Sequence, residues 1–143
     1  MTLYFAYGSN MSRAPMRKRC PTARPAGRAM LCGYRFVIMA NGYASVVPAA
    51  GENVHGLLWK VGPRDLAALD AYEDVAGGLY RKVTLPVLKD GETVEALVYI
   101  GCEKREGRAR ADYMALVVAA AADCGLPEDY VARLARFAPG TMR

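Results

Sequence analysis

The chain has 143 residues, of which 53% are hydrophobic and 23% are charged, and its formal net charge is +5. This length buries a hydrophobic core without disulfides or structural metals, so we expect one domain over residues 1–143. No apolar run approaches the roughly 20 residues of a membrane span, and Met1 leads directly into a predicted strand, so we expect a cytoplasmic protein with no membrane partner.

The first element is a strand that runs into a turn, Tyr4-Phe5-Ala6-Tyr7-Gly8-Ser9-Asn10-Met11, before a short helix over Ser12–Lys18. A strand that gives way to a helix start leaves backbone N–H groups without partners, and such a nest holds a carboxylate or a phosphate. We expect glycine at position 8 because a ligand that approaches closely and a positive φ both disfavour a Cβ. An ordinary β-turn with a capped helix is the alternative interpretation.

Hairpins dominate the middle of the chain. A loop is predicted through Gly27, and Asn41-Gly42 and Asp90-Gly91 are strong hairpin turn signals. The predicted strands are Arg28–Ala40, Ala44–Pro48, Val54–Val61, Tyr80–Leu88 and Thr93–Ile100. Further helices are predicted over Pro63–Glu73, from a cap at Asp112 to near Gly125, and over Pro127–Phe137. The class is α+β with a curved, mainly antiparallel or mixed sheet.

One carboxylate in the helix over Pro63–Glu73 is unusual. Leu66 and Leu69 define its buried stripe, and Glu73 falls between them at 100° per residue, whereas Asp65 and Asp74 lie off the stripe. Burial and the negative end of the helix dipole both raise the pKa of such a carboxyl toward neutrality, as a general acid/base requires. Alternatively, the helix frays or twists near Val75-Ala76-Gly77-Gly78, and Glu73 reaches solvent.

Other kinds of site have weak support. The four scattered cysteines and single histidine do not favour a zinc site and indicate reduced, mostly buried thiols. His55 lies within a predicted strand, where we expect a packed or edge histidine, and no phosphate-binding glycine motif is present. The basic residues lie in expected loops and one short helix, so we expect no nucleic-acid partner. With no supported ligand set or glycine motif, we also expect no cofactor and no metal.

Taken together, the motifs resemble those of the γ-glutamylcyclotransferase family. The marks are Tyr4–Met11, Gly56-Leu57-Leu58-Trp59, Leu69-Asp70-Ala71-Tyr72-Glu73, Gly78-Leu79-Tyr80 and Gly125-Leu126-Pro127-Glu128-Asp129-Tyr130, which occur in the family's order. The resemblance implies a small mixed β-barrel with flanking helices. It also implies an enzyme, monomeric or homodimeric, that cyclises a small-molecule γ-glutamyl amide to 5-oxoproline and releases the free amine.

The resemblance further implies roles for individual residues. Tyr7, Gly8, Ser9 and Asn10 would form the loop whose backbone holds the γ-glutamyl head, and Glu73 would be the general acid/base. Tyr80 and Tyr113 would be tyrosines of the pocket. The family commonly has glycine after the glutamate, and Asp74 stands there in this chain. A second carboxylate at that position would alter the loop or raise the pKa of Glu73 further.

Two other hypotheses remain beside this enzyme. A non-catalytic binding module would keep the anion-holding loop and bind a small carboxylate without turnover. Association with nucleic acid through the basic segments ranks last, and its sign would be an affinity that falls steeply with salt.

Overall fold

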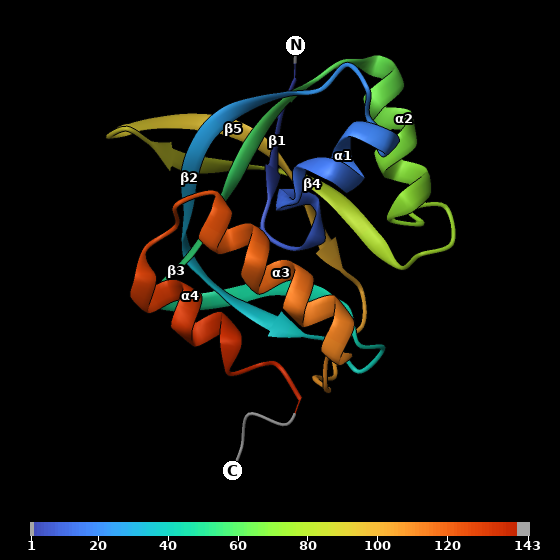
Figure 1. Cartoon of the computed structure of the whole chain (residues 1–143). Coiled ribbons are helices and arrows are strands. Elements are labelled where there is room, and N and C mark those ends of the chain that lie inside the picture. The colour runs from blue at the N-terminus through green and yellow to red at the C-terminus, as the bar shows by residue number, and fades with distance from the viewer. Residues whose placement is uncertain (1, 140–143) are drawn as a thin grey trace.

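Five strands close into a barrel in the order β1-β3-β2-β4-β5 in the computed structural model, which describes residues 2–139 (Figure 1). The strands are β1 (Thr2–Ala6), β2 (Arg24–Ile38), β3 (Ala44–Val61), β4 (Tyr80–Lys89) and β5 (Glu92–Gly101). Neighbouring strands run antiparallel except β1 and β5, which pair in parallel where Tyr4 faces Leu97. The closed sheet is therefore mixed.

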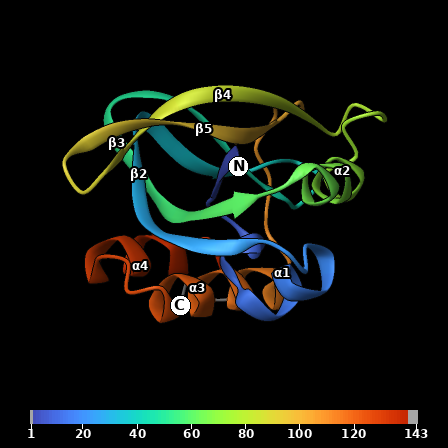
Figure 2. The same ribbon diagram turned by 90° about the horizontal axis from the view of Figure 1, so that it is seen from above.

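Helices flank the barrel. In the described residues they are the 3-10 turn η1 (Ser9–Met11), α1 (Arg13–Arg19), α2 (Pro63–Tyr72), α3 (Ala111–Asp123) and α4 (Glu128–Ala135). Figure 2 shows α3 and α4 side by side on one side of the barrel, with the β4–β5 hairpin on the opposite side. This arrangement confirms the predicted α+β class, a small mixed barrel with flanking helices. Within residues 2–139, no helix is both long enough and apolar enough to cross a membrane.

The two predicted hairpin turns form where the sequence places them. Asp90 and Gly91 have φ angles of 51° and 80° between β4 and β5, and the paired strands are in register from Tyr80 with Gly101 to Lys89 with Glu92. Asn41-Gly42 joins β2 to β3, with Gly42 at a φ of 92°. Two consecutive residues with positive φ suit the right-handed twist of a hairpin, which is why Asp-Gly serves in the first of these turns.

The strand boundaries in the middle of the chain differ from the prediction. β2 begins at Arg24, so part of the segment predicted as a loop through Gly27 belongs to the ladder with β3. β3 runs unbroken from Ala44 to Val61, where two strands were predicted. The register between β2 and β3 shifts twice, and Gly27 and Gly33 have positive φ within the two irregular stretches. A bulge of this kind lets glycine-rich residues stay in a ladder and bends the strand around a barrel.

Two aspartates and the cysteines also differ from the prediction. Asp65 is only 2% exposed, and its carboxylate accepts hydrogen bonds from the Gly62 amide at 3.0 Å and the Thr22 hydroxyl at 2.7 Å, which offset the cost of burying it. Asp112 lies within the first turn of α3, whose N-cap is Arg110. All four cysteines are free thiols, but only Cys20 is fully buried; Cys124 is partly buried, and Cys32 and Cys102 are exposed.

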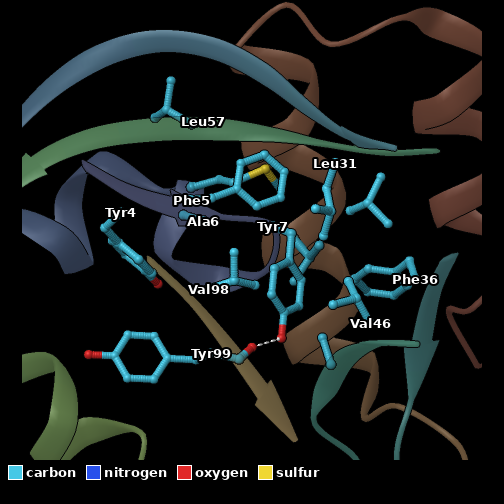
Figure 3. Close-up of a cluster of buried hydrophobic side chains, with 14 of the residues drawn as sticks. Tyr4, Phe5, Ala6, Tyr7, Leu31, Phe36, Val46, Leu57, Val98 and Tyr99 are labelled. Atoms are coloured by element: carbon cyan, nitrogen blue, oxygen red, sulfur yellow. Dashed lines mark hydrogen bonds between the residues drawn. The ribbon is translucent and has the colours of Figure 1, made fainter. Parts of the chain in front are cut away.

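The barrel interior is filled by the inward residues of the strands. Phe5, Leu31, Val46 and Val98 are almost fully buried and lie together in this core (Figure 3). Alternation along each strand places every second side chain inside, so β1 alone contributes Tyr4 and Phe5 to opposite faces. Figure 3 also shows the rings of Tyr4, Tyr7 and Tyr99 gathered beside this apolar cluster.

Candidate active site

A cavity of about 130 Å³ opens beside the aromatic cluster at one end of β1. Its wall contains all seven predicted site residues: Tyr7, Gly8, Ser9, Asn10, Glu73, Tyr80 and Tyr113. The structure thus brings together residues from the turn after β1, from η1, from the residue that follows α2, and from β4 and α3. Their chemical roles stay predictions.

The turn after β1 forms one wall of this cavity. Gly8 is the N-cap of η1, and its carbonyl accepts the Met11 amide at 3.1 Å. Within the described residues, no acceptor takes the amide hydrogens of Gly8, Ser9 or Asn10, which leaves them available to a ligand. The φ of Gly8 is −122°, so the predicted positive φ is wrong. Close approach is the remaining reason for glycine, since an added Cβ would lie 3.3 Å from the Tyr113 hydroxyl.

Asn10 holds the turn from within. Its side chain, 3% exposed, donates to the Tyr4 hydroxyl at 2.9 Å and accepts a hydrogen bond from Arg19. The Trp59 indole donates to its main-chain carbonyl at 3.0 Å. Both ends of the Asn10 amide are therefore committed to protein partners. The Asn10 side chain shapes the turn, and the group that Asn10 leaves available to a ligand is its main-chain amide.

Glu73 lies directly after the last residue of α2, and its amide still donates to the Leu69 carbonyl at 2.8 Å. The side chain is partly buried and lines the cavity. Burial raises the pKa of Glu73 to about 7, and the nearby Arg19 guanidinium partly opposes this rise. No donor within residues 2–139 hydrogen-bonds to its carboxylate. A carboxyl that is half protonated near neutral pH, with no hydrogen-bond donor in the described residues, is able to accept and return a proton.

Asp74 adopts the left-handed conformation, with a φ of 51°. Glycine favours this region and Asp tolerates it, so the chain keeps the backbone that glycine would give. The Asp74 carboxylate accepts the Gly77 amide at 3.1 Å, and it is not among the charges that shift the pKa of Glu73. The predicted further rise caused by Asp74 is therefore wrong.

Tyr80 and Tyr113 meet at Ala44, the first residue of β3. The Tyr80 hydroxyl donates to the Ala44 carbonyl at 2.5 Å, and the Ala44 amide donates to the Tyr113 hydroxyl at 3.2 Å. Burial raises the pKa of both phenols above their usual value, so both stay neutral at physiological pH. The Tyr113 hydroxyl keeps its own hydrogen available as a donor.

Sequence reasoning missed several residues of the wall. They are Tyr4, Tyr43, Ala44, Tyr72, Leu79 and Tyr99. Seven of the chain's nine tyrosines line the cavity, counting Tyr7, Tyr80 and Tyr113 with these. Two features of the sequence could have indicated them. The chain has nine tyrosines against three phenylalanines, and Tyr4 and Tyr99 occupy inward positions on β1 and β5. A tyrosine-rich wall supplies flat apolar surface with hydroxyl groups at its edges.

Known proteins share both the sequence pattern and the barrel. Residues 4–115 match the family described as gamma-glutamyl cyclotransferase, AIG2-like. The gamma-glutamylcyclotransferases of Mus musculus and Homo sapiens are 24% and 26% identical to this chain, each over 96% of the chain and 79% of the relative. A solved structure of a gamma-glutamyl cyclotransferase superposes with a TM-score of 0.91 at 24% identity, covering 98% of this chain and 89% of that one. The crystal structure of an uncharacterized protein from Homo sapiens gives 0.90 at 25% identity, covering 99% and 90%.

Proposed function

The chain belongs to the gamma-glutamyl cyclotransferase, AIG2-like family, and we propose that it converts a γ-glutamyl amide into 5-oxoproline with release of the free amine. The observation that carries the proposal is the Glu73 carboxyl. Its pKa is raised to about 7, it has no hydrogen-bond donor in residues 2–139, and it shares a cavity with the Gly8–Asn10 amides. One group moves protons, and the other holds an anion.

The proposed reaction is an intramolecular acyl transfer. The α-amino nitrogen of the γ-glutamyl group attacks its own γ-carbonyl carbon, forming the new C–N bond of a five-membered ring. Glu73, as the carboxylate, takes the proton that this nitrogen loses. The protonated Glu73 then gives that proton to the departing nitrogen as the old amide bond breaks. The products are 5-oxoproline and the free amine, and the carboxylate is regenerated.

The rest of the cavity supports this chemistry by position. The Gly8, Ser9 and Asn10 amides would bind the α-carboxylate of the substrate or the oxyanion that develops on the γ-carbonyl. Tyr113 would donate to the same group, since its hydroxyl hydrogen is not used in the bond with Ala44. Folding the substrate so that amine and carbonyl meet accounts for much of the rate, because attack within one held molecule avoids an entropic cost. Ring closure of this kind involves no oxidation or reduction.

The test is direct detection of product. Purified protein is incubated with a panel of γ-glutamyl amino acids and γ-glutamyl amines, and 5-oxoproline and the released amine are quantified by mass spectrometry. We expect equimolar products from at least one substrate. Glu73→Gln, which keeps the shape, should lower the rate by about 100-fold or more because the proton carrier is lost. Glu95→Gln, an exposed change on β5, is the matched control and should keep the wild-type rate.

Absence of 5-oxoproline across the whole panel would contradict the proposal. Binding of 5-oxoproline or of a γ-glutamyl amide without turnover, unchanged in Glu73→Gln, would instead identify a carboxylate-binding module of the same fold.

A further inference from the structure

Arg19, the last residue of α1, contacts two separate parts of the cavity wall. Its guanidinium donates a hydrogen bond to the Asn10 side-chain oxygen. The same guanidinium lies 3.4 Å from the centroid of the Tyr72 ring. A planar cation stacked on an aromatic face and hydrogen-bonded at its edge has little freedom to move. Arg19 therefore has a defined position beside the site.

The first contact fixes the turn. Asn10 is buried and also bonds to the Tyr4 hydroxyl, so Arg19 completes a chain of bonds that begins in the barrel core. Because both ends of the Asn10 amide are occupied, the turn that presents the Ser9 and Asn10 amides cannot rotate without breaking one of these bonds.

The second contact, with the Tyr72 ring, is made beside Glu73. Tyr72 is the last residue of α2 and directly precedes Glu73. The Tyr72 hydroxyl also lies 3.3 Å from the Ser9 hydroxyl oxygen, within hydrogen-bond distance. Arg19 and Ser9 thus both join the turn after β1 to the end of α2, although Tyr72 itself is 43% exposed.

Arg19 is the charged group that acts on Glu73, whose other electrostatic neighbours in the cavity are tyrosines. The tyrosines whose phenols interact electrostatically with Glu73 come from every wall of the cavity: Tyr4, Tyr7, Tyr80, Tyr99 and Tyr113. Burial raises the pKa of each of them, so they carry no charge near neutral pH. Arg19 is the group that lowers the pKa of Glu73 against the effect of burial.

We propose that Arg19 is a positioning residue that joins the ligand-holding turn to the end of α2 and supplies the positive charge that keeps Glu73 in use as a base. The inference deepens the proposed function and rests on it, since it assigns a role in the same cavity. Without this charge Glu73 would hold its proton more tightly and fewer molecules would have the carboxylate form at neutral pH.

The test titrates Glu73 in the full chain by NMR of ¹³C-labelled glutamate carboxyls, with Glu73→Gln identifying the resonance. In Arg19→Gln we expect the midpoint to rise by roughly half to one pH unit, because a nearby opposite charge is lost. Arg17→Gln removes the same charge from an exposed position on α1 and should leave the midpoint at the wild-type value. An unchanged midpoint in folded Arg19→Gln would overturn the proposal.

Two further variants separate charge from geometry. Arg19→Lys keeps the charge and should keep the midpoint near the wild-type value. Tyr72→Leu removes the ring that orients Arg19, and we expect a smaller rise in the midpoint. Should Arg19→Gln not fold, Tyr72→Leu decides the question at an exposed position, and a wild-type midpoint there would count against the proposal.

Turnover gives an independent readout. In Arg19→Gln, kcat should be roughly two- to fivefold lower near pH 7 and should recover near pH 9, because a base with a raised pKa is ionised at higher pH. An equal loss of kcat at every pH would indicate a merely structural role and would contradict the proposal. Should the wild type form no 5-oxoproline, the proposed function fails, while the NMR titration still decides the role of Arg19.

Discussion

Tyr7 donates its hydroxyl hydrogen to the main-chain carbonyl of Tyr99 at 2.6 Å, which joins the end of β1 to β5 inside the barrel (Figure 3). The Tyr99 hydroxyl in turn donates to Asp70 on α2 at 2.6 Å, and Asp70 pairs with Lys82 on β4 at 2.8 Å. These bonds lock α2 onto the barrel. Since Glu73 follows α2 directly, its position depends on this network.

Tyr7→Phe should lower the free energy of unfolding by about 1–3 kcal/mol, because it leaves the buried Tyr99 carbonyl without its donor. Denaturant unfolding followed by circular dichroism measures the change. Tyr34→Phe is the matched control, since the Tyr34 hydroxyl has no hydrogen bond in the described part of the chain, and it should be near neutral. Equal stability of the two variants would show that the bond contributes nothing.

Glu73→Gln should become more stable relative to the wild type as pH rises. Folding raises the pKa of Glu73 from 4.5 to about 7, so between these values the folded protein keeps a proton that the unfolded chain has released. The wild-type free energy of unfolding therefore falls over this interval, by about 3 kcal/mol from this group alone. Glutamine does not titrate, so the variant lacks this loss.

The measurement is denaturant unfolding of wild type and Glu73→Gln at about pH 4 and about pH 8, bracketing the interval over which the group titrates. Other titrating groups are common to both proteins and cancel in the difference. Glu95→Gln, on the exposed face of β5, controls for loss of a carboxylate as such. A difference between wild type and Glu73→Gln that stays constant with pH would show that folding does not perturb Glu73.

Local patterns allowed much of the fold and part of the site to be predicted. Asn41-Gly42 and Asp90-Gly91 predict hairpin turns because few other residues adopt the positive φ angles that such turns require. The turn at Gly8 and the wheel position of Glu73 are likewise properties of short segments, and the structure places both at one cavity. Features that depend on about ten consecutive residues could therefore be predicted from the sequence.

Contacts between segments that are distant in the sequence could not be predicted. Asp65 lies off the apolar stripe of α2, yet it is buried because the chain around Thr22 folds over the start of that helix. Arg19 and Tyr72 meet across 52 intervening residues, and neither segment predicts the other. Unbroken β3 was missed for the same reason: the sequence predicts one strand ending at Pro48 and another starting at Val54, whereas pairing with β2 keeps the strand continuous.

Asp74→Gly should leave stability within about 0.5–1 kcal/mol of the wild type, because glycine relieves the left-handed backbone while the Asp74–Gly77 bond is lost. Asp74→Ala loses the same bond but keeps a Cβ in that conformation, so it should be less stable than Asp74→Gly by about 1 kcal/mol. Denaturant unfolding of both variants measures this. Both should keep the wild-type titration of Glu73, and a lowered pKa in either would show that the Asp74 charge acts on the site.

Gly8→Ala should fold with nearly wild-type stability but bind ligand weakly. Its φ is not left-handed, and the added Cβ would lie 3.3 Å from the Tyr113 hydroxyl and 3.6 Å from the Ala44 Cβ, which small shifts relieve. The methyl group would, however, occupy space beside the amides that are proposed to hold the substrate. We expect KM, or the Kd of 5-oxoproline measured by calorimetry, to rise by about tenfold, the equivalent of roughly 1.4 kcal/mol.

Gly56→Ala is the contrasting change. Its Cβ would lie 2.3 Å from the Ala6 carbonyl oxygen, which belongs to the backbone and cannot move aside, so this variant should lose stability rather than affinity. If Gly8→Ala bound 5-oxoproline as tightly as the wild type, the ligand would not approach the Gly8 backbone. The anion would then have to be held elsewhere in the tyrosine-lined wall.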